Sequence, residues 1–390
     1  MRSLFIGPVV VVGFVACQAA VSSEPPAAPP RPPAPLEGPA APSRASDASV
    51  EPDAGGADAS PGDAALADAS AAPDASAQAE GPSACPEGMK LIDGDYCTKV
   101  EQTCTKSWWD DVNKKKVCEN FSAPSRCVGE KERKRYCIDT YEYPNIEHAR
   151  PEVMNNFYQA QVKCAALGKR MCTESEWTLA CEGPEMKPYP YGYERDATKC
   201  NGDHQYDFPK MTKVARRDSA ELERLWLGVP SGTQPECVSD YGVADMPGNA
   251  DEVASNEHFS GFEDKYDNVT IGGPWYLGVR NQCRPRIYTH DEGFYYYYLS
   301  FRCCAEPDGK PTDPRAPRQV KRGWDFERVE RIAGLTVEQA KARQPADFDR
   351  ARKLGEQQLK DRQGKPADHL TWQPNQGRDK NFTREHERKN

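Results

Sequence analysis

Hydrophobic side chains recur at helical spacing over residues 155–168, and this pattern predicts an amphipathic helix. The apolar positions that fall on one face are Phe157, Ala160, Cys164 and Leu167. Asn155 or Asn156 can cap the start, because a short polar side chain accepts hydrogen bonds from the free N–H groups of the first turn. Gly168 can end the helix, since glycine readily adopts the left-handed conformation that follows many helices.

A second helix is predicted directly afterwards. Thr173-Glu174-Ser175-Glu176 has the spacing of a capping box, in which the threonine and the second glutamate each satisfy a free backbone N–H group. The helix would run through Trp177 to about Cys181.

The apolar pattern at the N-terminus is that of an export signal. Leu4–Val15 is apolar and too short to remain as a membrane-spanning helix. We expect residues 1–16 to be a signal peptide and Cys17 to be lipidated, because a small residue precedes this cysteine as in a bacterial lipobox. The alternative is ordinary cleavage near Ala19 or Ala20. Without Cys17 the 15 cysteines become 14, an even set that can pair completely.

Two segments have too few apolar positions for a core. Residues 17–84 are mostly Ala, Pro, Ser and Asp, and we expect a disordered, extended linker. Residues 306–390 carry 20 Lys and Arg against 15 Asp and Glu. Pro345 and Gly355 interrupt their helix-favouring stretches, so we expect a charged, largely disordered tail. Because the surplus is only five positive charges (20 − 15) on an exported protein, we expect no nucleic-acid binding.

Cysteines are concentrated between these two segments, with 14 of them from Cys85 to Cys304. No Cys-x-x-Cys pair occurs, so the spacing is not that of a zinc site and instead indicates disulfides formed in an oxidising compartment. We expect residues 85–135 to be a Cys-rich extension and residues 136–305 to be one folded domain.

Several sequence blocks follow one another through this domain. They are Tyr136–Glu142, Cys164 with Gly168-Lys169-Arg170, Thr173–Trp177, Tyr189–Gly192, Tyr241–Asn249, Gly272–Trp275 and Ser300–Cys303. In this order they resemble the formylglycine-generating enzyme, or sulfatase-modifying-factor, domain family, although Ser300 stands where that family usually has Gly. The resemblance implies an α+β fold related to C-type lectins, disulfide-rich and with little regular secondary structure.

The resemblance also bears on catalysis. Enzymes of this family carry two cysteines just after the Gly-Gly block, which bind copper(I) and activate oxygen to oxidise a substrate cysteine to formylglycine. Soft thiolates suit copper(I). The corresponding segment here, Tyr276–Arg284, holds only Cys283, which aligns with a structural cysteine that follows the catalytic pair. The resemblance therefore implies no catalytic residues, no copper, and the disulfides Cys181–Cys283 and Cys164–Cys303. A lone reactive thiol at Cys283 is the alternative.

An acidic turn, Asp245–Glu252, is the candidate metal site. Calcium takes several oxygen ligands, including backbone carbonyls, on a tight loop. The resembling family block binds structural calcium, which implies ligands at Asp245, Gly248, Ala250 and Glu252. This sequence has Asp251 and Val253 where the family has Trp. A second calcium site is implied at Asn201 and Gly202, and a solvated acidic turn is the alternative to the first site.

Four consecutive tyrosines end the segment Asp291–Tyr298. In an extended chain, alternation would place two rings inside and two outside. Exposed tyrosine pairs often form binding surfaces, and they equally often cover the edge of a domain.

These features predict an exported protein, anchored by lipid at the outer membrane or cell surface, or otherwise periplasmic or secreted. Its domain would be a non-catalytic binding or scaffold module whose partner is an exported protein or a glycan. The alternative is a divergent metal-dependent, oxygen-using enzyme that acts on exported protein substrates.

Overall fold

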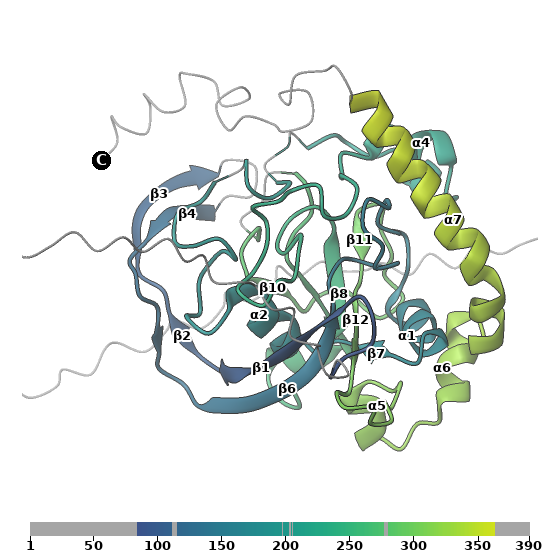
Figure 1. Ribbon diagram of the computed structural model, residues 1–390, viewed down its shortest axis with the longest axis horizontal. Coiled ribbons are helices and arrows are strands. Elements are labelled where there is room, and N and C mark those ends of the chain that lie inside the picture. The colour runs from purple at the N-terminus through teal and green to yellow at the C-terminus, as the bar shows by residue number, and fades with distance from the viewer. Residues whose placement is uncertain are drawn as a thin grey trace, which may run out of the picture. The chain divides into compact units, whose positions relative to one another are not determined.

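The computed structural model describes residues 84–110, 115–196, 198–202, 204, 206–276 and 280–362. The predicted signal peptide, Cys17 and all but the last residue of the predicted 17–84 linker lie outside the described residues. The described part contains two four-stranded sheets, two two-stranded sheets, several short helices and one long C-terminal helix (Figure 1). Long stretches between them form ordered loops, so the fold is α+β with little regular secondary structure, as predicted.

The first sheet has the strand order β1-β6-β12-β7. β1 (Met89–Cys97) pairs antiparallel with β6 (Lys131–Asp139) along its whole length. The short strands β12 (Cys303–Ala305) and β7 (Arg170–Met171) continue the sheet. β1 belongs to the predicted Cys-rich extension, residues 85–135, so the first strand of this extension lies in the first sheet beside β6.

The second sheet has the order β10-β9-β8-β11. β8 (Asp251–Ser255) lies between β9 (Asn268–Ile271), which is antiparallel to it, and β11 (Leu299–Ser300), which is parallel. β10 (Arg286–Ile287) pairs with the far edge of β9. Every residue of β8, β9 and β11 is buried, so this sheet is internal and brings the acidic turn before β8 into the core.

Two smaller strand pairs lie at the N-terminal side. β2 (Val100–Glu101) pairs with β5 (Arg126–Cys127), and β3 (Cys104–Asp110) pairs with β4 (Lys115–Phe121). The β3–β4 hairpin projects from the edge of the domain in Figure 1.

Both predicted helices of the central segment are present. α1 (Phe157–Ala166) begins with a capping box in which Asn156 and Gln159 satisfy each other's backbone N–H groups. α2 (Glu174–Glu182) begins with the predicted box between Thr173 and Glu176. Three short helical elements follow, namely α3 (Met211–Ala215), α4 (Ser219–Leu225) and the 3-10 helix η1 (Phe262–Lys265).

The C-terminal segment differs from its prediction. The predicted tail covers residues 306–390, of which 363–390 lie outside the described residues. Residues 306–362 contain three helices, namely α5 (Pro317–Lys321), α6 (Phe326–Ala333) and α7 (Val337–Arg362). α6 and the start of α7 form a small core with α1, made by Val162, Ala166, Val329, Ala333, Leu335 and Ala340. In Figure 1, α7 runs along one side of the domain past α1 and α4. The apolar positions are few, but they meet an apolar face on α1, so a small number suffices.

Gly355 and Pro345, which were expected to interrupt a helix, both lie inside α7. Gly355 packs directly on the backbone of His148, where an added Cβ would lie 1.9 Å from the His148 carbonyl oxygen. The backbone N–H of Arg150 also donates to the carbonyl oxygen of Ala351. Gly355 is thus a packing contact between helix and loop, and tertiary contacts outweigh its low helix propensity.

All 14 cysteines from Cys85 to Cys304 form disulfides. The pairs are Cys85–Cys137, Cys97–Cys127, Cys104–Cys118, Cys164–Cys303, Cys172–Cys304, Cys181–Cys283 and Cys200–Cys237. Cys164–Cys303 and Cys181–Cys283 are the two pairings that the resemblance implies. Four of the seven bridges join cysteines more than 50 residues apart, so they connect distant parts of the chain across the core.

Candidate functional site

Three carboxylates and one guanidinium are buried together around the acidic turn. Arg302 forms a two-pronged ion pair with Glu252, with Nε–Oε2 at 2.8 Å and Nη2–Oε1 at 2.7 Å. Its Nη2 also donates to the carbonyl oxygen of Ala244 at 3.2 Å. Arg302, Glu252, Asp245 and Glu142 are each at most 2% exposed. The site therefore carries more negative than positive charge in a place that water does not reach.

Burial and the neighbouring negative charges raise the pKa values of Asp245 and Glu142. One oxygen of Asp245 accepts a hydrogen bond from the backbone N–H of Gly232 at 2.7 Å, and its Oδ1 is buried without a hydrogen-bond partner. Burial raises the pKa of Asp245 to about 6. Burial, followed by the nearby charge of Asp245, raises the pKa of Glu142 well above its usual range.

Asn249 links this cluster to the loops around it. Its side-chain nitrogen donates to Glu142 at 2.9 Å, and its side-chain oxygen accepts from the backbone N–H of Val229 and from the side chain of Asn201. The Asn201 carbonyl oxygen in turn accepts from the backbone N–H of Asn249 at 2.7 Å. The side-chain oxygen of Asn201 is hydrogen-bonded to the ring Nε2 of His204 at 2.7 Å.

The predicted calcium ligands differ in whether they have an oxygen available for a cation. Asp245 fits, since its buried Oδ1 is the kind of oxygen that a cation would complete. Glu252 does not fit, because Arg302 takes both of its oxygens. The side chain of Asn201, in the second predicted site, directs both polar atoms to protein partners and so does not fit either. Within the described ranges, no group of three or more His, Cys, Asp or Glu side chains is arranged to hold a metal ion.

Sequence reasoning missed Glu142 and Arg302. Both lie inside blocks that the resemblance had already marked, Tyr136–Glu142 and Ser300–Cys303. A charged residue within an otherwise apolar or aromatic block was the available signal, because such a residue is seldom buried unless it has a partner.

The segment that follows the Gly-Gly block is described except for residues 277–279, and its described residues contact other parts of the domain. Cys283 is fully buried and bonded to Cys181. Arg280 forms an ion pair with Asp251 at 2.6 Å, and the same carboxylate accepts from the backbone N–H of Gly273. Asp251, at the position where the resembling family has Trp, thus ties this segment to β8.

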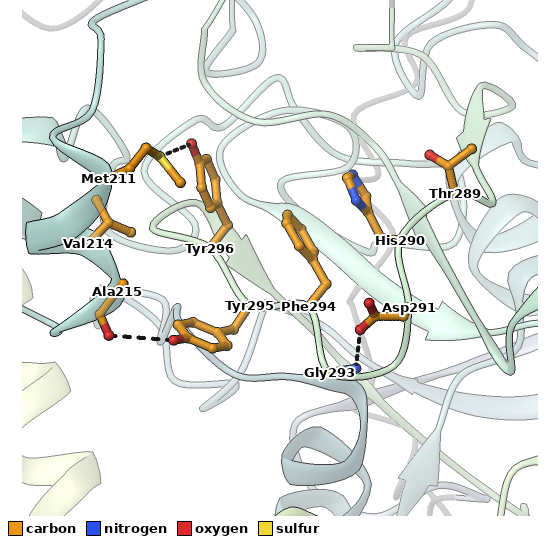
Figure 2. Close-up of a pocket in the computed structure, with 10 residues that line it drawn as sticks. All are labelled: Met211, Val214, Ala215, Thr289, His290, Asp291, Gly293, Phe294, Tyr295 and Tyr296. Carbon is orange, nitrogen blue, oxygen red and sulfur yellow. Dashed lines mark hydrogen bonds between the residues drawn. The ribbon is translucent and has the colours of Figure 1, made fainter. Parts of the chain in front are cut away.

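A separate hollow of about 360 Å³ opens between α3 and the segment Thr289–Tyr296. Figure 2 shows α3 on one side, with the aromatic rings of the segment facing it. The residues that line it are Met211, Val214, Ala215, Thr289, His290, Asp291, Gly293, Phe294, Tyr295 and Tyr296. It is the candidate binding site of the domain, since concave, mostly apolar hollows with a few polar groups are typical of ligand sites.

The rings in this hollow are ordered by stacking. The ring of His290 lies parallel to that of Phe294, with centroids 3.9 Å apart and planes 6° apart (Figure 2). Phe294 also stacks on Tyr296 at 5.6 Å. Burial lowers the pKa of His290, which favours the neutral ring.

The four tyrosines do not alternate as an extended strand would. Tyr295 and Tyr296 are half-buried at the hollow, whereas Tyr297 and Tyr298 are both buried in the core. The reason is that β11 begins only at Leu299. Tyr297 and Tyr298 lie in the turn before it, and Tyr295 and Tyr296 lie in irregular chain before that turn. The same four residues thus both line a hollow and cover the core.

Comparison with protein families finds one match. Residues 95–307, more than half of the chain, match the profile of the sulfatase-modifying factor enzyme 1-like domain. No curated protein matches the chain.

Solved structures that are similar include PvdO from Pseudomonas aeruginosa, which is 15% identical with a TM-score of 0.34 and covers 56% of this chain and 94% of that one. CarF is 13% identical with a TM-score of 0.37, covering 57% of this chain and 99% of that one. Treponema denticola variable protein 1 is 16% identical with a TM-score of 0.30, covering 56% and 95%.

Proposed function

The chain belongs to the sulfatase-modifying factor enzyme 1-like family, and from this premise we propose that its domain is a non-catalytic binding or scaffold module of the cell envelope. The seven disulfides indicate an oxidising environment outside the cytoplasm. Along the described part of the chain, no helix is long and apolar enough to cross a membrane.

The observation that carries the proposal is the state of Cys283. Copper(I) chemistry of the family type needs thiolates, and the segment from Gly272 to Arg284 contains this cysteine alone. Its sulfur is bonded to Cys181 and buried, so it offers no thiolate to a metal or to oxygen. A binding module has no need of that thiolate, whereas an oxidase of this type does.

A thiol titration tests the proposal: the protein is exported and allowed to fold, and is then denatured without a reductant so that every free thiol becomes accessible. We expect no free thiol among the 14 cysteines from Cys85 to Cys304, no copper(I) uptake and no conversion of a cysteine-containing sulfatase peptide to its aldehyde. A free Cys283 that binds copper(I) and supports that conversion would instead establish the alternative, a divergent oxygen-using enzyme acting on exported proteins.

Calcium is a further part of the proposal, centred on Asp245 and the carbonyls of Gly248 and Ala250. The unpartnered buried oxygen of Asp245 supports it, while the ion pair of Glu252 argues for a site poorer in carboxylates than the resemblance implied. With calcium in 100-fold excess over its Kd, we expect the Tm to rise by about 5 °C or more. The Asp245→Asn variant should lose most of this rise, and an equal rise in wild type and variant would place the cation elsewhere.

Attachment through a lipid at Cys17 completes the proposed arrangement, with an acidic linker between anchor and domain. We expect Cys17→Ser to move the protein from the membrane fraction to the soluble fraction of the envelope, measured by fractionation and blotting. A variant that stays with membranes would show that lipid at Cys17 is not the anchor.

A further inference from the structure

We propose that the hollow between α3 and Thr289–Tyr296 binds a terminal ring of an uncharged glycan. This inference rests on the proposed binding function and adds its ligand class. The argument uses the ring surfaces, the polar edge, the charges and the size of the hollow.

The ring surfaces suit a flat ligand with an apolar face. Phe294 is stacked between His290 and Tyr296, with interplanar angles of 6° and 21°, so the three rings form one stack that Phe294 holds together. Because all three rings line the hollow, a ligand would meet the ring edges and the outer faces of this stack. A pyranose ring has one face made largely of C–H groups, and such a face packs against aromatic surface. Met211, which is 54% exposed, extends this apolar surface from the α3 side.

The polar edge suits a ligand rich in hydrogen-bond donors. Thr289, His290 and Asp291 lie at one end of the hollow. Asp291 accepts from the backbone N–H of Gly293 through Oδ1 at 2.8 Å, and an ionised carboxylate only accepts hydrogen bonds. Ligand hydroxyl groups supply the donors that such a carboxylate needs.

The tyrosine hydroxyls, by contrast, are directed to protein partners. The Tyr296 hydroxyl lies 3.3 Å from the sulfur of Met211, and the Tyr295 hydroxyl lies 3.5 Å from the carbonyl oxygen of Ala215 (Figure 2). A proline-rich peptide also packs on aromatic grooves, but it offers mainly carbonyl acceptors and therefore needs donors from the protein. Thr289 and His290 can each donate one hydrogen bond, but Asp291 only accepts them and is the one charged side chain that lines the hollow, which favours the hydroxyl-rich glycan over the peptide.

Charge around the hollow favours a neutral ligand. The Arg217 guanidinium lies over the ring of Tyr295, 4.8 Å from its centroid, so a cationic ligand would meet a positive charge at that side. An anionic ligand would meet Asp291 at the other end. The volume of about 360 Å³ falls at the lower end of the range for small-molecule sites, which suits a glycan end of one or two rings.

The experiment uses the full exported protein on an array of neutral oligosaccharides that end in glucose, galactose, mannose or N-acetylglucosamine. Sialylated and sulfated oligosaccharides and proline-rich peptides are printed beside them. We expect binding to one class of neutral end. Its affinity, measured by titration with the same oligosaccharide, should fall at least about tenfold in both Phe294→Ala and Asp291→Ala.

Two matched variants control for folding. Phe294→Tyr keeps a stacking ring and should retain binding, while Phe259→Ala removes another exposed aromatic ring outside the hollow and should leave binding unchanged. The inference is overturned if no neutral oligosaccharide binds, if binding is indifferent to Phe294 and Asp291, or if a proline-rich peptide is the ligand that Phe294 controls. The thiol titration is independent of these results, so the glycan can fail while the non-catalytic function stands.

Discussion

Arg302 is the residue on which the buried acidic turn most depends. It neutralises Glu252 and donates to the carbonyl oxygen of Ala244 in the loop before β8. It also donates to the carbonyl oxygens of Asp139, the last residue of β6, and of Thr140 just after it. A buried ion pair contributes little net stability compared with apolar residues, but losing one partner leaves a charge without solvent or partner. Asp245 and Glu142 already lie nearby, so that charge would find no relief from them.

Arg302→Met is therefore expected to lower the free energy of unfolding by about 3–5 kcal/mol in urea denaturation. The double variant Glu252→Gln with Arg302→Met removes both charges and should lose less than the single variant. Equal losses in the two would mean that packing, and not the unpaired carboxylate, sets the cost.

Glu221 provides a pH-dependent contact beside the candidate site. Its carboxylate accepts from the side chain of Arg224 at 2.7 Å and from the backbone N–H of Lys210 at 2.8 Å, which connects α4 to the start of α3. The hydrogen bond from Arg224 is the main cause that lowers the pKa of Glu221 from 4.5 to about 2, and the hydrogen bond from Lys210 is the next. A lowered pKa means that the folded state favours the ionised form, so this stabilisation is present above pH 4.5 and is lost as the pH falls towards 2.

Glu221→Gln should therefore be less stable than wild type at pH 7, and the difference should shrink between pH 4.5 and about 2. Urea midpoints measured across this range test the prediction. A difference that stays constant with pH would show that the amide loses only packing.

At the scale of elements, the sequence predicted a helix correctly where the stabilising contacts lie within the helix itself and the residues just before it. The capping boxes of α1 and α2 lie within four residues of sequence, so the sequence alone locates both helices. α7 was missed because its glycine packs on the loop at His148, a contact that no local pattern contains.

The same limit explains the candidate site. The acidic turn was recognisable from its own residues. The ion pair of Glu252 with Arg302, 50 residues away, is a tertiary contact that no local pattern contains. The hollow combines α3 with a segment about 80 residues later, and only the tyrosines of that segment carried a signal.

The Gly355→Ala variant tests the packing of α7, because helix propensity and packing predict opposite changes in the free energy of unfolding. Alanine favours helix over glycine by about 1 kcal/mol, so an exposed site would gain stability. Because the new Cβ would collide with the backbone of His148, we expect a loss of about 1–3 kcal/mol and a lower Tm. Lys353→Ala, on the exposed face of α7, is the control and should change little. A stabilised Gly355→Ala would show that α7 does not pack on that loop.

For the whole molecule, disulfides and packing act together. The bridges close loops of very different length, from 14 residues for Cys104–Cys118 to 139 for Cys164–Cys303. In the chain-entropy account, a longer closed loop restricts the unfolded chain more, so its bridge stabilises the fold more.

Removal of single bridges should follow this order. We expect Cys164→Ala with Cys303→Ala to lower the free energy of unfolding by about 4–5 kcal/mol and Cys104→Ser with Cys118→Ser by about 3 kcal/mol. Urea denaturation of both, beside fully reduced protein, is the measurement. A reduced domain that keeps native near-ultraviolet circular dichroism would mean that packing alone holds the fold.

The adjacent cysteines of β12 also set an order of events in biogenesis. Cys303 and Cys304 bond to residues 139 and 132 positions earlier, on α1 and just before α2. At synthesis rates of roughly 5–20 residues per second, a chain extruded from its N-terminus would deliver Cys164 and Cys172 on the order of ten seconds before their partners. In that interval the waiting thiols can react with each other or with earlier cysteines. A bond formed in that interval has to be exchanged once the last strand has arrived, so we expect an oxidoreductase that exchanges disulfides to speed the maturation of this protein.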